Sequence, residues 1–451
     1  MDRTERRIVA FTAGSHGLVH TYELSIPILL TVWIAEFSTT AATVGAVVTV
    51  GYGLFGAGAL PSGVLVDRFG SKPMILACLL GMGVSFLLVG AAPSLPVLAL
   101  ALAVWGITAS VYHPAGLALL STAVDRRGAA LGYHGIGGNL GIAFGPLAAV
   151  LLLIAFDWRV VAGLLTIPAF VVAAYGSTVD VDAALVGTPA TDGGTDDETA
   201  ANGDISLAGF LGDTRTLMTV GFGLVLVFVT FSGLYYRAFL TFLPDLLGDT
   251  LGGLVDLRLV EAGPYADQFD PARYLYVAVL MVGVPGQYLG GRIADRIPPE
   301  RGLVYVMSVL ATLALLFVSA RGAVWSFLAV SALLGVALFT VQPLSQATVA
   351  AYSPSGTRGL SFGYTYLAIF GVGSLGAGLA GAVLTAAGIR ELFVVLAGIA
   401  GLGALAALGV GTLGDAANRP ERTALPARSV PVLAVVVACG AAVVVVFLVA
   451  G

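Results

Sequence analysis

Charged residues are scarce in this chain of 451 residues, because Asp, Glu, Lys and Arg together make up 10% of it, against about 25% in a typical soluble domain. Hydrophobic residues make up 58%. A soluble fold of this size could not hide so much apolar surface, nor keep the rest solvated with so few charges. The composition therefore excludes an ordinary soluble protein and predicts a chain that crosses a membrane many times.

Positive charge and cysteine are also in short supply. The formal net charge is −5, which excludes the basic surface of a nucleic-acid-binding protein. The two cysteines, Cys78 and Cys439, lie far apart inside apolar runs. This placement excludes a disulfide framework and a cysteine-based zinc site.

The usual catalytic motifs are missing as well. Neither H-E-x-x-H nor G-x-x-x-x-G-K-[ST] occurs, so we expect neither zinc-dependent hydrolysis nor ATP hydrolysis of the P-loop type. A G-x-S-x-G match at 359–363 opens a predicted membrane helix, whereas the hydrolase motif needs a strand-to-helix turn. We predict that the chain is not an enzyme and holds no resident metal or cofactor.

What the sequence has instead is a series of long apolar runs. A helix needs about 20 apolar residues to cross the hydrocarbon layer. The first run has no cleavage site and carries histidines and a glutamate, so we predict a true span and not a signal peptide. The runs predict twelve helices plus one, near 9–34, 42–66, 73–91, 95–123, 128–156, 160–179, 216–246, 273–293, 302–320, 323–352, 359–386, 389–412 and 429–450.

The distribution of basic residues tests this series of helices. With the N-terminus inside, 15 of the 21 Lys and Arg residues fall in inner segments, five in outer segments, and Arg237 within a helix. Such a bias is expected of a correct topology. We predict a multi-pass protein of the cell membrane with its N-terminus in the cytoplasm. The thirteenth helix would place the C-terminus outside.

The two halves of the chain repeat each other. Three sequence matches occur in the same order at shifts of 228 to 231 residues, and they fall in corresponding helices. We predict two six-helix bundles, 1–179 and 216–412, joined by an acidic cytoplasmic linker at 180–215. A cytoplasmic loop at 413–428 and the extra helix at 429–451 would follow. The matches pair Gly63, Asp67 and Arg68 with Gly291, Asp295 and Arg296; Gly106, His113 and Pro114 with Gly335, Gln342 and Pro343; and Arg127 to Tyr133 with Arg358 to Tyr364.

Parallel repeats of this kind form secondary transporters, with the binding site between the halves. The pattern Gly63-x3-Asp67-Arg68-x-Gly70-x-Lys72 resembles the signature loop of the major facilitator superfamily. Its degenerate copy at 291–296 lies where that family keeps one. The resemblance implies two six-helix bundles around a central cavity that opens alternately to each side.

Two further motifs resemble those of exporters. Gly132-x8-Gly141-x3-Gly145-Pro146 is similar to the antiporter motif of the family, although Ala149-Val150 stands where the motif closes with Gly-Gly. The fourth helix has Leu102 where proton-coupled exporters often have arginine. The segments 110–114 and 134–146 resemble the fosmidomycin-resistance branch, which implies export of small, often anionic compounds.

The signature loop also has a physical role to predict. Asp67 ends a helix and can meet the positive N-terminus of the eleventh helix near Arg358. By symmetry, Asp295 can meet the fifth helix near Arg127. Such contacts exist in one state only and would bias the equilibrium between states. We predict gating roles for Gly63, Asp67, Arg68, Gly70, Lys72, Gly291, Asp295, Arg296, Arg127 and Arg358.

All four histidines lie within predicted membrane helices. Helical spacing places His16, His20 and Glu23 within roughly 60° on one face. Ionisable groups at this depth usually line a pathway, and histidine titrates near neutrality. We predict that His16, His20, Glu23, His113 and His134 couple transport to protons. The alternative is that the histidines donate hydrogen bonds to backbone carbonyls and only shape the packing. For His134 the sequence favours neither a role in the cavity nor a structural role.

Arg237 follows Tyr235 and Tyr236 in the seventh helix. A permanent cation beside aromatic rings suits a carboxylate, phosphate or phosphonate. We predict that these three residues and Gln342 bind the solute. The alternatives for Arg237 are a structural ion pair with Asp245 or Glu23, or snorkelling towards the membrane surface.

The sequence as a whole predicts a secondary transporter that moves a small organic solute across the bilayer by proton-coupled efflux. Proton-coupled uptake of an organic anion is the second possibility. Two rivals from other classes are a haem protein with paired histidines and a metal transporter built on His16, His20 and Glu23. The expected partners are the solute, protons or another coupling ion, and lipid, with no nucleic acid and a monomer favoured.

Overall fold

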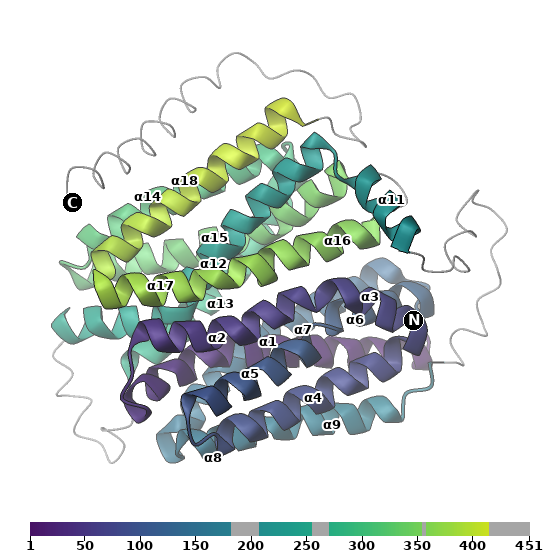
Figure 1. The fold of residues 1–451 in the computed structure, drawn as a ribbon, viewed down its shortest axis with the longest axis horizontal. Helices are drawn as coiled ribbons and strands as arrows, with labels where there is room; N and C mark the ends of the chain where they lie inside the picture. The colour runs from purple at the N-terminus through teal and green to yellow at the C-terminus, as the bar shows by residue number, and fades with distance from the viewer. Residues whose placement is uncertain (182–206, 255–269, 354–357, 415–451) are drawn as a thin grey trace. The chain divides into compact units, whose positions relative to one another are not determined.

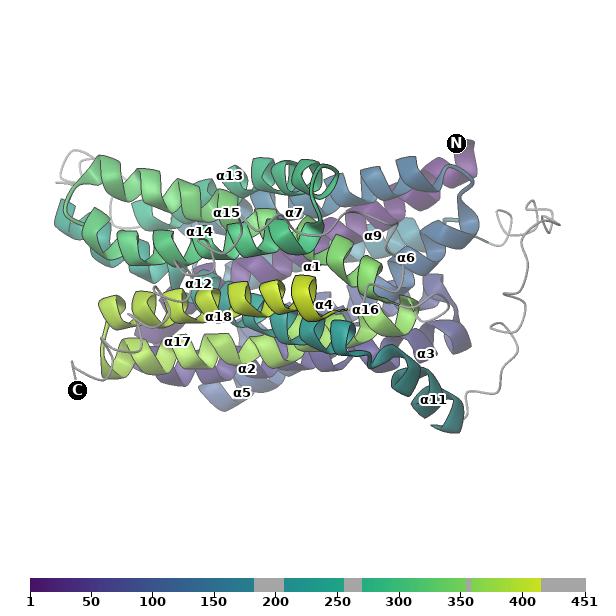
Figure 2. The ribbon, with the colours of Figure 1, turned by 90° about the horizontal axis from the view of Figure 1, so that it is seen from above.

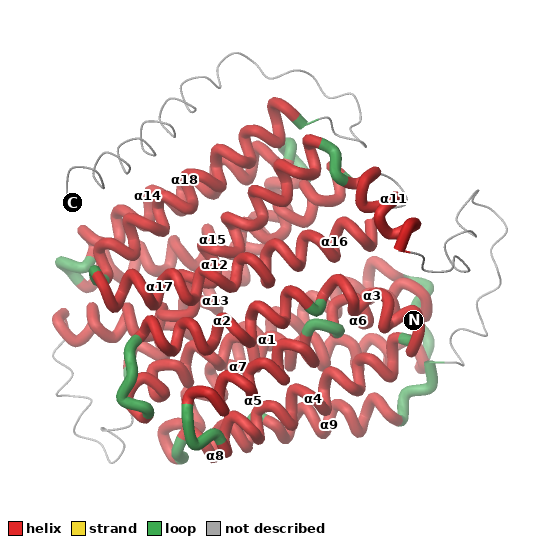
Figure 3. The backbone as a smooth tube through the Cα atoms, viewed as in Figure 1, coloured by secondary structure: helices red, strands yellow, loops and turns green. Residues whose placement is uncertain are grey.

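The computed structural model describes residues 1–181, 207–254, 270–353 and 358–414. Within these ranges every regular element is a helix and no strand occurs (Figure 3). Eleven helical segments of the described chain are long and apolar enough to cross a membrane, and a bent pair adds a twelfth if it counts as one span. The all-α fold is therefore confirmed. The predicted cytoplasmic loop at 413–428 lies outside the described residues from residue 415 onward, and so does the whole predicted thirteenth helix, 429–450.

The helices follow the predicted apolar runs closely, but several spans are interrupted. Their bounds are α1 Arg3–Glu36, α2 Ala41–Ala57, α3 Ala59–Phe69, α4 Ser71–Ala91, α5 Leu95–Ala109, α6 Tyr112–Ala123, α7 Arg127–Ala155, α8 Trp158–Leu164, α9 Thr166–Ser177, α11 Leu207–Leu217, α12 Val220–Leu254, α13 Pro271–Ala294, α14 Pro299–Ala320, α15 Val324–Tyr352, α16 Arg358–Tyr366, η3 Leu367–Gly371, η4 Val372–Ser374, α17 Leu375–Ala386 and α18 Ile389–Leu413.

The break between α5 and α6 has a local cause. Pro114 has no N–H group to bond to the carbonyl of Ser110 four residues earlier. The helix ends at Ala109 and restarts at Tyr112, which puts Pro114 in the first turn of α6, where no donor is needed. The fourth span is therefore interrupted for a short stretch next to His113.

One helix forms where we expected linker. Residues 182–206 lie outside the described chain, but Leu207–Leu217 forms α11. The sequence LAGFLGDTRTL has apolar residues three and four positions apart, which is the spacing of an amphipathic helix. The acidic composition of the segment hid this short pattern.

The chain divides into two compact units. Unit 1 comprises Met1–Ser38 and Val50–Thr214, and unit 2 comprises Thr39–Thr49 and Arg215–Gly451. In unit 1, α1 and α7 lie side by side (Figure 1). In unit 2, α13 lies beside α15 (Figure 2).

Glycines bring α1 and α7 into backbone contact. A Cβ atom at Gly141 would collide with the carbonyl of Gly17, and one at Gly145 would collide with Thr21. Unit 2 has the same arrangement, because Gly233 of α12 lies against the backbone of Ile369 and Gly376 lies against Leu234. The first and fifth spans of each half therefore cross at small residues.

A second pair of contacts supports the internal repeat. Gly106 of α5 lies against the carbonyl of Gly51, and Gly335 of α15 lies against the carbonyl of Val279. Gly106 corresponds to Gly335, and Gly51 corresponds to Val279, at shifts of 229 and 228 residues, as the predicted repeat requires. The two halves thus repeat their packing as well as their motifs.

Candidate functional site

The four histidines, which come from three helices, form one cluster in unit 1. The ring of His16 stacks on that of His134, with centroids 4.0 Å apart. It also lies 4.8 Å from the ring of His20 and 5.3 Å from that of His113. The sequence predicted the shared face of His16 and His20 on α1, and the fold adds α6 and α7 to it.

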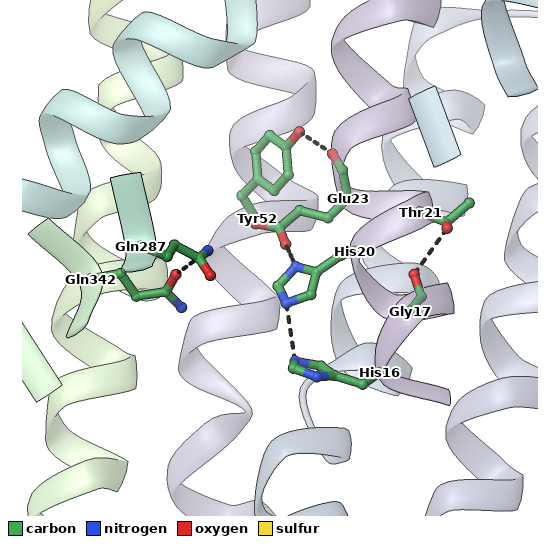
Figure 4. Close-up of polar contacts among 8 residues, drawn as sticks. All are labelled: His16, Gly17, His20, Thr21, Glu23, Tyr52, Gln287 and Gln342. Atoms are coloured by element: carbon green, nitrogen blue, oxygen red, sulfur yellow. Dashed lines mark hydrogen bonds and ion pairs between the residues drawn. The ribbon is translucent and has the colours of Figure 1, made fainter. Parts of the chain in front are cut away.

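Hydrogen bonds connect part of this cluster in a line (Figure 4). Nδ1 of His20 lies 2.8 Å from Oε2 of Glu23, and Nε2 of His20 lies 3.1 Å from Nε2 of His16. Nδ1 of His16 lies 2.8 Å from the backbone carbonyl oxygen of His134. Glu23 is 1% exposed and His20 is 8% exposed. A carboxyl group and two imidazoles are therefore in contact inside the helical bundle.

These three contacts restrict where the protons can lie. A carbonyl only accepts, so Nδ1 of His16 must donate to His134. The remaining contacts are satisfied in three ways: with Glu23 protonated, with His20 doubly protonated, or with His16 doubly protonated. All three have a net charge of zero. Removing one proton leaves a charge of −1 and breaks one of the bonds.

Aromatic residues surround the line. The Tyr52 hydroxyl donates to the carbonyl of Glu23 at 3.0 Å, and the Tyr112 hydroxyl donates to the carbonyl of Thr12. The ring of Phe55 lies 6.2 Å from that of His113. The two tyrosine hydrogen bonds thus join α2 and α6 to the backbone of α1 beside the line.

The spacing of the histidines suits a relay better than a metal centre. One nitrogen from each of His16, His20 and His113 lies within 4.8 Å of the others. Nitrogen ligands of a tetrahedral zinc ion are about 3.4 Å apart, because each Zn–N bond is about 2.0–2.1 Å. The His16–His20 separation of 3.1 Å is a normal hydrogen bond.

The glycines of the antiporter-like motif have unequal surroundings. Gly141 and Gly145 form the contact with α1, and Gly138 lies against the ring of His16. Gly132 has open space where a Cβ atom would be, and Pro146 lies inside α7. The middle of this segment thus places α7 beside the histidines.

Arg237 is buried in unit 2, only 2% exposed. Its guanidinium lies 5.4 Å from the ring of Tyr236 and 5.6 Å from that of Phe370. Tyr235 is 1% exposed and packs beside Phe239. Of the two predicted tyrosines, Tyr236 is the one in contact with the cation.

An irregular helix supplies Phe370. Residues Leu367–Gly371 form a π-helix and Val372–Ser374 a 3₁₀ turn between α16 and α17. Such insertions are frequent at functional sites. No proline marks this segment, so neither the break nor the role of Phe370 could be predicted from the sequence.

Gln342 lies on α15, as predicted, but it has a partner that we did not predict. Nε2 of Gln287 on α13 lies 3.0 Å from Oε1 of Gln342 (Figure 4). Gln287 has no polar counterpart in the first repeat, where Ala59 stands 228 residues earlier. A single glutamine in an apolar run does not by itself indicate a binding site, which is why Gln287 was not predicted.

The comparisons with known proteins agree with this fold. The sequence model of the Major Facilitator Superfamily matches residues 12–266 and 264–451. The chain belongs to the Major Facilitator Superfamily. It is therefore a multi-pass membrane transporter of a small solute and not an enzyme.

Curated relatives of this superfamily match short stretches only. The puromycin resistance protein pur8 of Streptomyces alboniger is 40% identical over 108 residues, 23% of this chain and 22% of the relative. An uncharacterized MFS-type transporter of Mycobacterium tuberculosis is 38% identical over 114 residues, 23% of this chain and 27% of the relative. The matches thus span about a quarter of each relative or less.

Solved structures of superfamily members share the fold at low identity. A bacterial homologue of the lysosomal transporter Spinster superposes with a TM-score of 0.66 at 15% identity, covering 94% of this chain and all of the other. The nucleoside transporter NupG gives 0.67 at 12% identity, with coverage of 90% and 100%. A D-xylose-proton symporter gives 0.64 at 15% identity, with coverage of 91% and 98%.

The motif that resembles the superfamily signature loop begins inside α3 and ends in the first turn of α4. Gly70 has φ +82° and ψ 153°, a conformation that is essentially restricted to glycine. Lys72 donates to the carbonyls of Ser177 and Val179 at 3.1 and 2.6 Å. Gly63 and Gly291 have open space where a Cβ atom would be.

The structure describes only some of the charged residues for which we predicted gating contacts. Arg68 and Arg296 are exposed, and Asp295 caps the end of α13. The side chains of Asp67, Arg127 and Arg358 lie outside the described part of the chain. The gating contacts of Asp67 near Arg358 and of Asp295 near Arg127 therefore stay predictions.

Proposed function

We propose that this chain is a proton-coupled exporter of small organic anions that works by alternating access. The observation that carries the proposal is the buried line of Glu23, His20 and His16. It connects a carboxyl group to two imidazoles within one membrane span, and each of these groups can hold and release a proton.

The energetics of the membrane favour this role over a purely structural one. A charged group at the centre of a bilayer costs about 2.5–3.5 kcal/mol, so such groups are usually functional. Every arrangement that satisfies the three hydrogen bonds of the line is neutral overall. Holding the proton keeps the site uncharged, and releasing it leaves one negative charge that must face water. The site therefore fits a proton carrier that exchanges with solvent in one state and is occluded in another.

The proposed anion site is Arg237 with Tyr236. A guanidinium stays protonated, and its planar donors match a carboxylate or phosphonate. The flanking rings at 5.4 and 5.6 Å favour a solute with a flat apolar part. Gln342 would supply further hydrogen bonds.

Two observations support export rather than uptake. The fifth span carries the glycines that resemble the antiporter motif, and one relative is by its name a resistance protein. The proposed orientation has the N-terminus in the cytoplasm, as the distribution of basic residues predicts.

Proteoliposomes with an imposed pH gradient test the proposal. Vesicles with an acidic lumen and trapped pyranine receive benzoate, orotate or phenylphosphonate. An antiporter accumulates its anion while the lumen becomes alkaline. Accumulation driven by acid outside would instead establish uptake by symport.

Variants distinguish a loss of proton coupling from a loss of anion transport itself. Glu23→Gln should reduce gradient-driven accumulation to below a tenth of wild type, while exchange of labelled for unlabelled anion survives. Glu36→Gln is the matched control, because Glu36 lies on the same helix and pairs with Arg159 outside the cluster. Equal loss of accumulation and exchange in Glu23→Gln would contradict proton coupling at this site.

A further inference from the structure

Gln287 and Gln342 form a pair of amides inside the membrane spans of unit 2. Gln287 is half-buried and Gln342 is exposed, and their side chains are joined by a hydrogen bond of 3.0 Å. Gln287 lies seven residues before the end of α13, about 10 Å along the helix. Exposed amides at this depth cannot face lipid without losing hydrogen bonds worth several kcal/mol. We therefore expect the two amides to face a polar space and not lipid.

The helices beneath the pair are held closely together. Gly286 lies against the backbone of Val336, and Gly290 lies against Thr340 and the ring of Pro343. The Thr340 hydroxyl donates to the carbonyl of Gly286 at 3.0 Å, next to Gln287 in the chain. The two amides are therefore positioned by backbone contacts before any ligand arrives.

The hydrogen bond fixes what the pair can offer a ligand. One amide uses an N–H and the other uses its carbonyl oxygen, so an NH₂ group remains on one side chain and a C=O group on the other. Exchanging the O and N atoms of both amides reverses the bond and leaves the same set. The pair thus presents one donor and one acceptor side by side, whichever way the amides are assigned.

Aromatic residues connect this pair to the proposed anion site. Phe339 lies on α15 one turn before Gln342, and its ring lies 6.4 Å from that of Tyr236. Tyr236 in turn contacts the guanidinium of Arg237. Unit 2 therefore carries a cation, flat rings and a donor–acceptor pair on three helices that contact one another, α12, α13 and α15.

We propose that the Gln287–Gln342 pair recognises the edge of a planar cyclic amide or imide, in which an N–H and a C=O are adjacent. The ring N–H donates to the free amide oxygen, and the ring C=O accepts from the free NH₂ group. This inference rests on the proposed function, because Arg237 would hold the anionic group of the same solute. It narrows the substrate class to flat heterocyclic anions that carry a lactam or imide edge.

Binding to the purified full-length protein tests this without any gradient. The probe is orotate, a uracil ring that carries a carboxylate. 1,3-Dimethylorotate has the same charge and the same ring but carries methyl groups in place of both ring N–H groups, and benzoate has the carboxylate alone. We expect orotate to bind about tenfold more tightly than either, the effect of one or two hydrogen bonds. Gln342→Leu and Gln287→Leu should remove this preference, so that orotate binds no more tightly than 1,3-dimethylorotate.

The outcomes distinguish the two proposals. Equal affinity for orotate and dimethylorotate, with benzoate still bound in an Arg237-dependent way, would overturn the amide-edge inference and leave the anion site standing. Absence of binding by all three anions would overturn both. If Gln342→Leu weakens all three probes alike, the pair serves the fold and not recognition. Gln342→Met, which keeps the length of the side chain and adds no charge, should also lose the preference because it removes the donor.

Discussion

Nδ1 of His20 lies 2.8 Å from a carboxylate oxygen of Glu23, one turn further along the same membrane helix. The side chain of Glu23 is 1% exposed, so the pair is separated from bulk water. Removing one partner of a buried pair leaves the other without compensation. The pair therefore has to be treated as one functional group, and its variants should behave accordingly.

The double variant His20→Ala/Glu23→Gln should lose no more gradient-driven transport than either single variant. Both side chains handle the same proton, and residues that act as a unit have non-additive effects. Accumulation in acid-lumen vesicles measures this. Effects that multiply would mean that the two residues work independently.

His134 contributes its backbone carbonyl to the line, and its ring contributes a stacking surface. Its Nε2 atom has no hydrogen-bond partner among the described residues. We therefore expect His134→Phe to keep most of the gradient-driven transport. His16→Phe keeps a ring but interrupts the line, and should abolish it. Loss of coupling in both variants would place the His134 ring in the proton path.

The contact between α1 and α7 depends on Gly141. A methyl group there would meet the carbonyl of Gly17, and overpacking of this kind costs about 1–3 kcal/mol. We expect Gly141→Ala to lower the Tm of the protein in detergent. Gly132→Ala on the same helix has open space around the new methyl group and should leave the Tm unchanged. Equal Tm values for the two variants would contradict the close crossing.

Arg237 should not be replaceable by lysine. An ammonium group keeps the charge but loses the planar fork that binds a carboxylate through two parallel bonds. We expect Arg237→Lys to raise the KM for benzoate or orotate about tenfold or more, since hydrogen bonds to charged groups are worth about 1.5–3 kcal/mol.

The control for this variant is Arg292→Lys. Arg292 also lies beside a tyrosine, with its guanidinium 5.1 Å from the ring of Tyr288, but on an exposed part of α13. It should leave the KM unchanged. A KM unaffected by Arg237→Lys would assign Arg237 to a structural role.

Much of the fold was predictable because each span is a long apolar run, and local composition decides where such a helix begins and ends. The interruption at Ser110 follows from Pro114, a local signal. The π-helix at 367–371 has no such mark. It lies beside the close crossing of Gly233 and Gly373, which brings together residues far apart in the sequence.

In the candidate site too, contacts within one helix were predictable and contacts between helices were not. Helical spacing placed His16, His20 and Glu23 on one face, because all three lie on one helix. The approach of His113 and His134 depends on how three helices pack, which spacing alone does not determine. Gln287 was missed because its meaning comes from Gln342 on another helix.

The zero net charge of the loaded proton site has an electrical consequence. The line holds one exchangeable proton, so we take the proposed exchange as one proton entering the cell for each monovalent anion that leaves. Each movement carries one positive charge equivalent inward, so a full cycle is electrogenic. A membrane potential of 100 mV, negative inside, would then add about 4.6 kcal/mol to the driving force, at about 2.3 kcal/mol per charge. Such an exporter would continue to work when the pH gradient has collapsed and only the voltage remains.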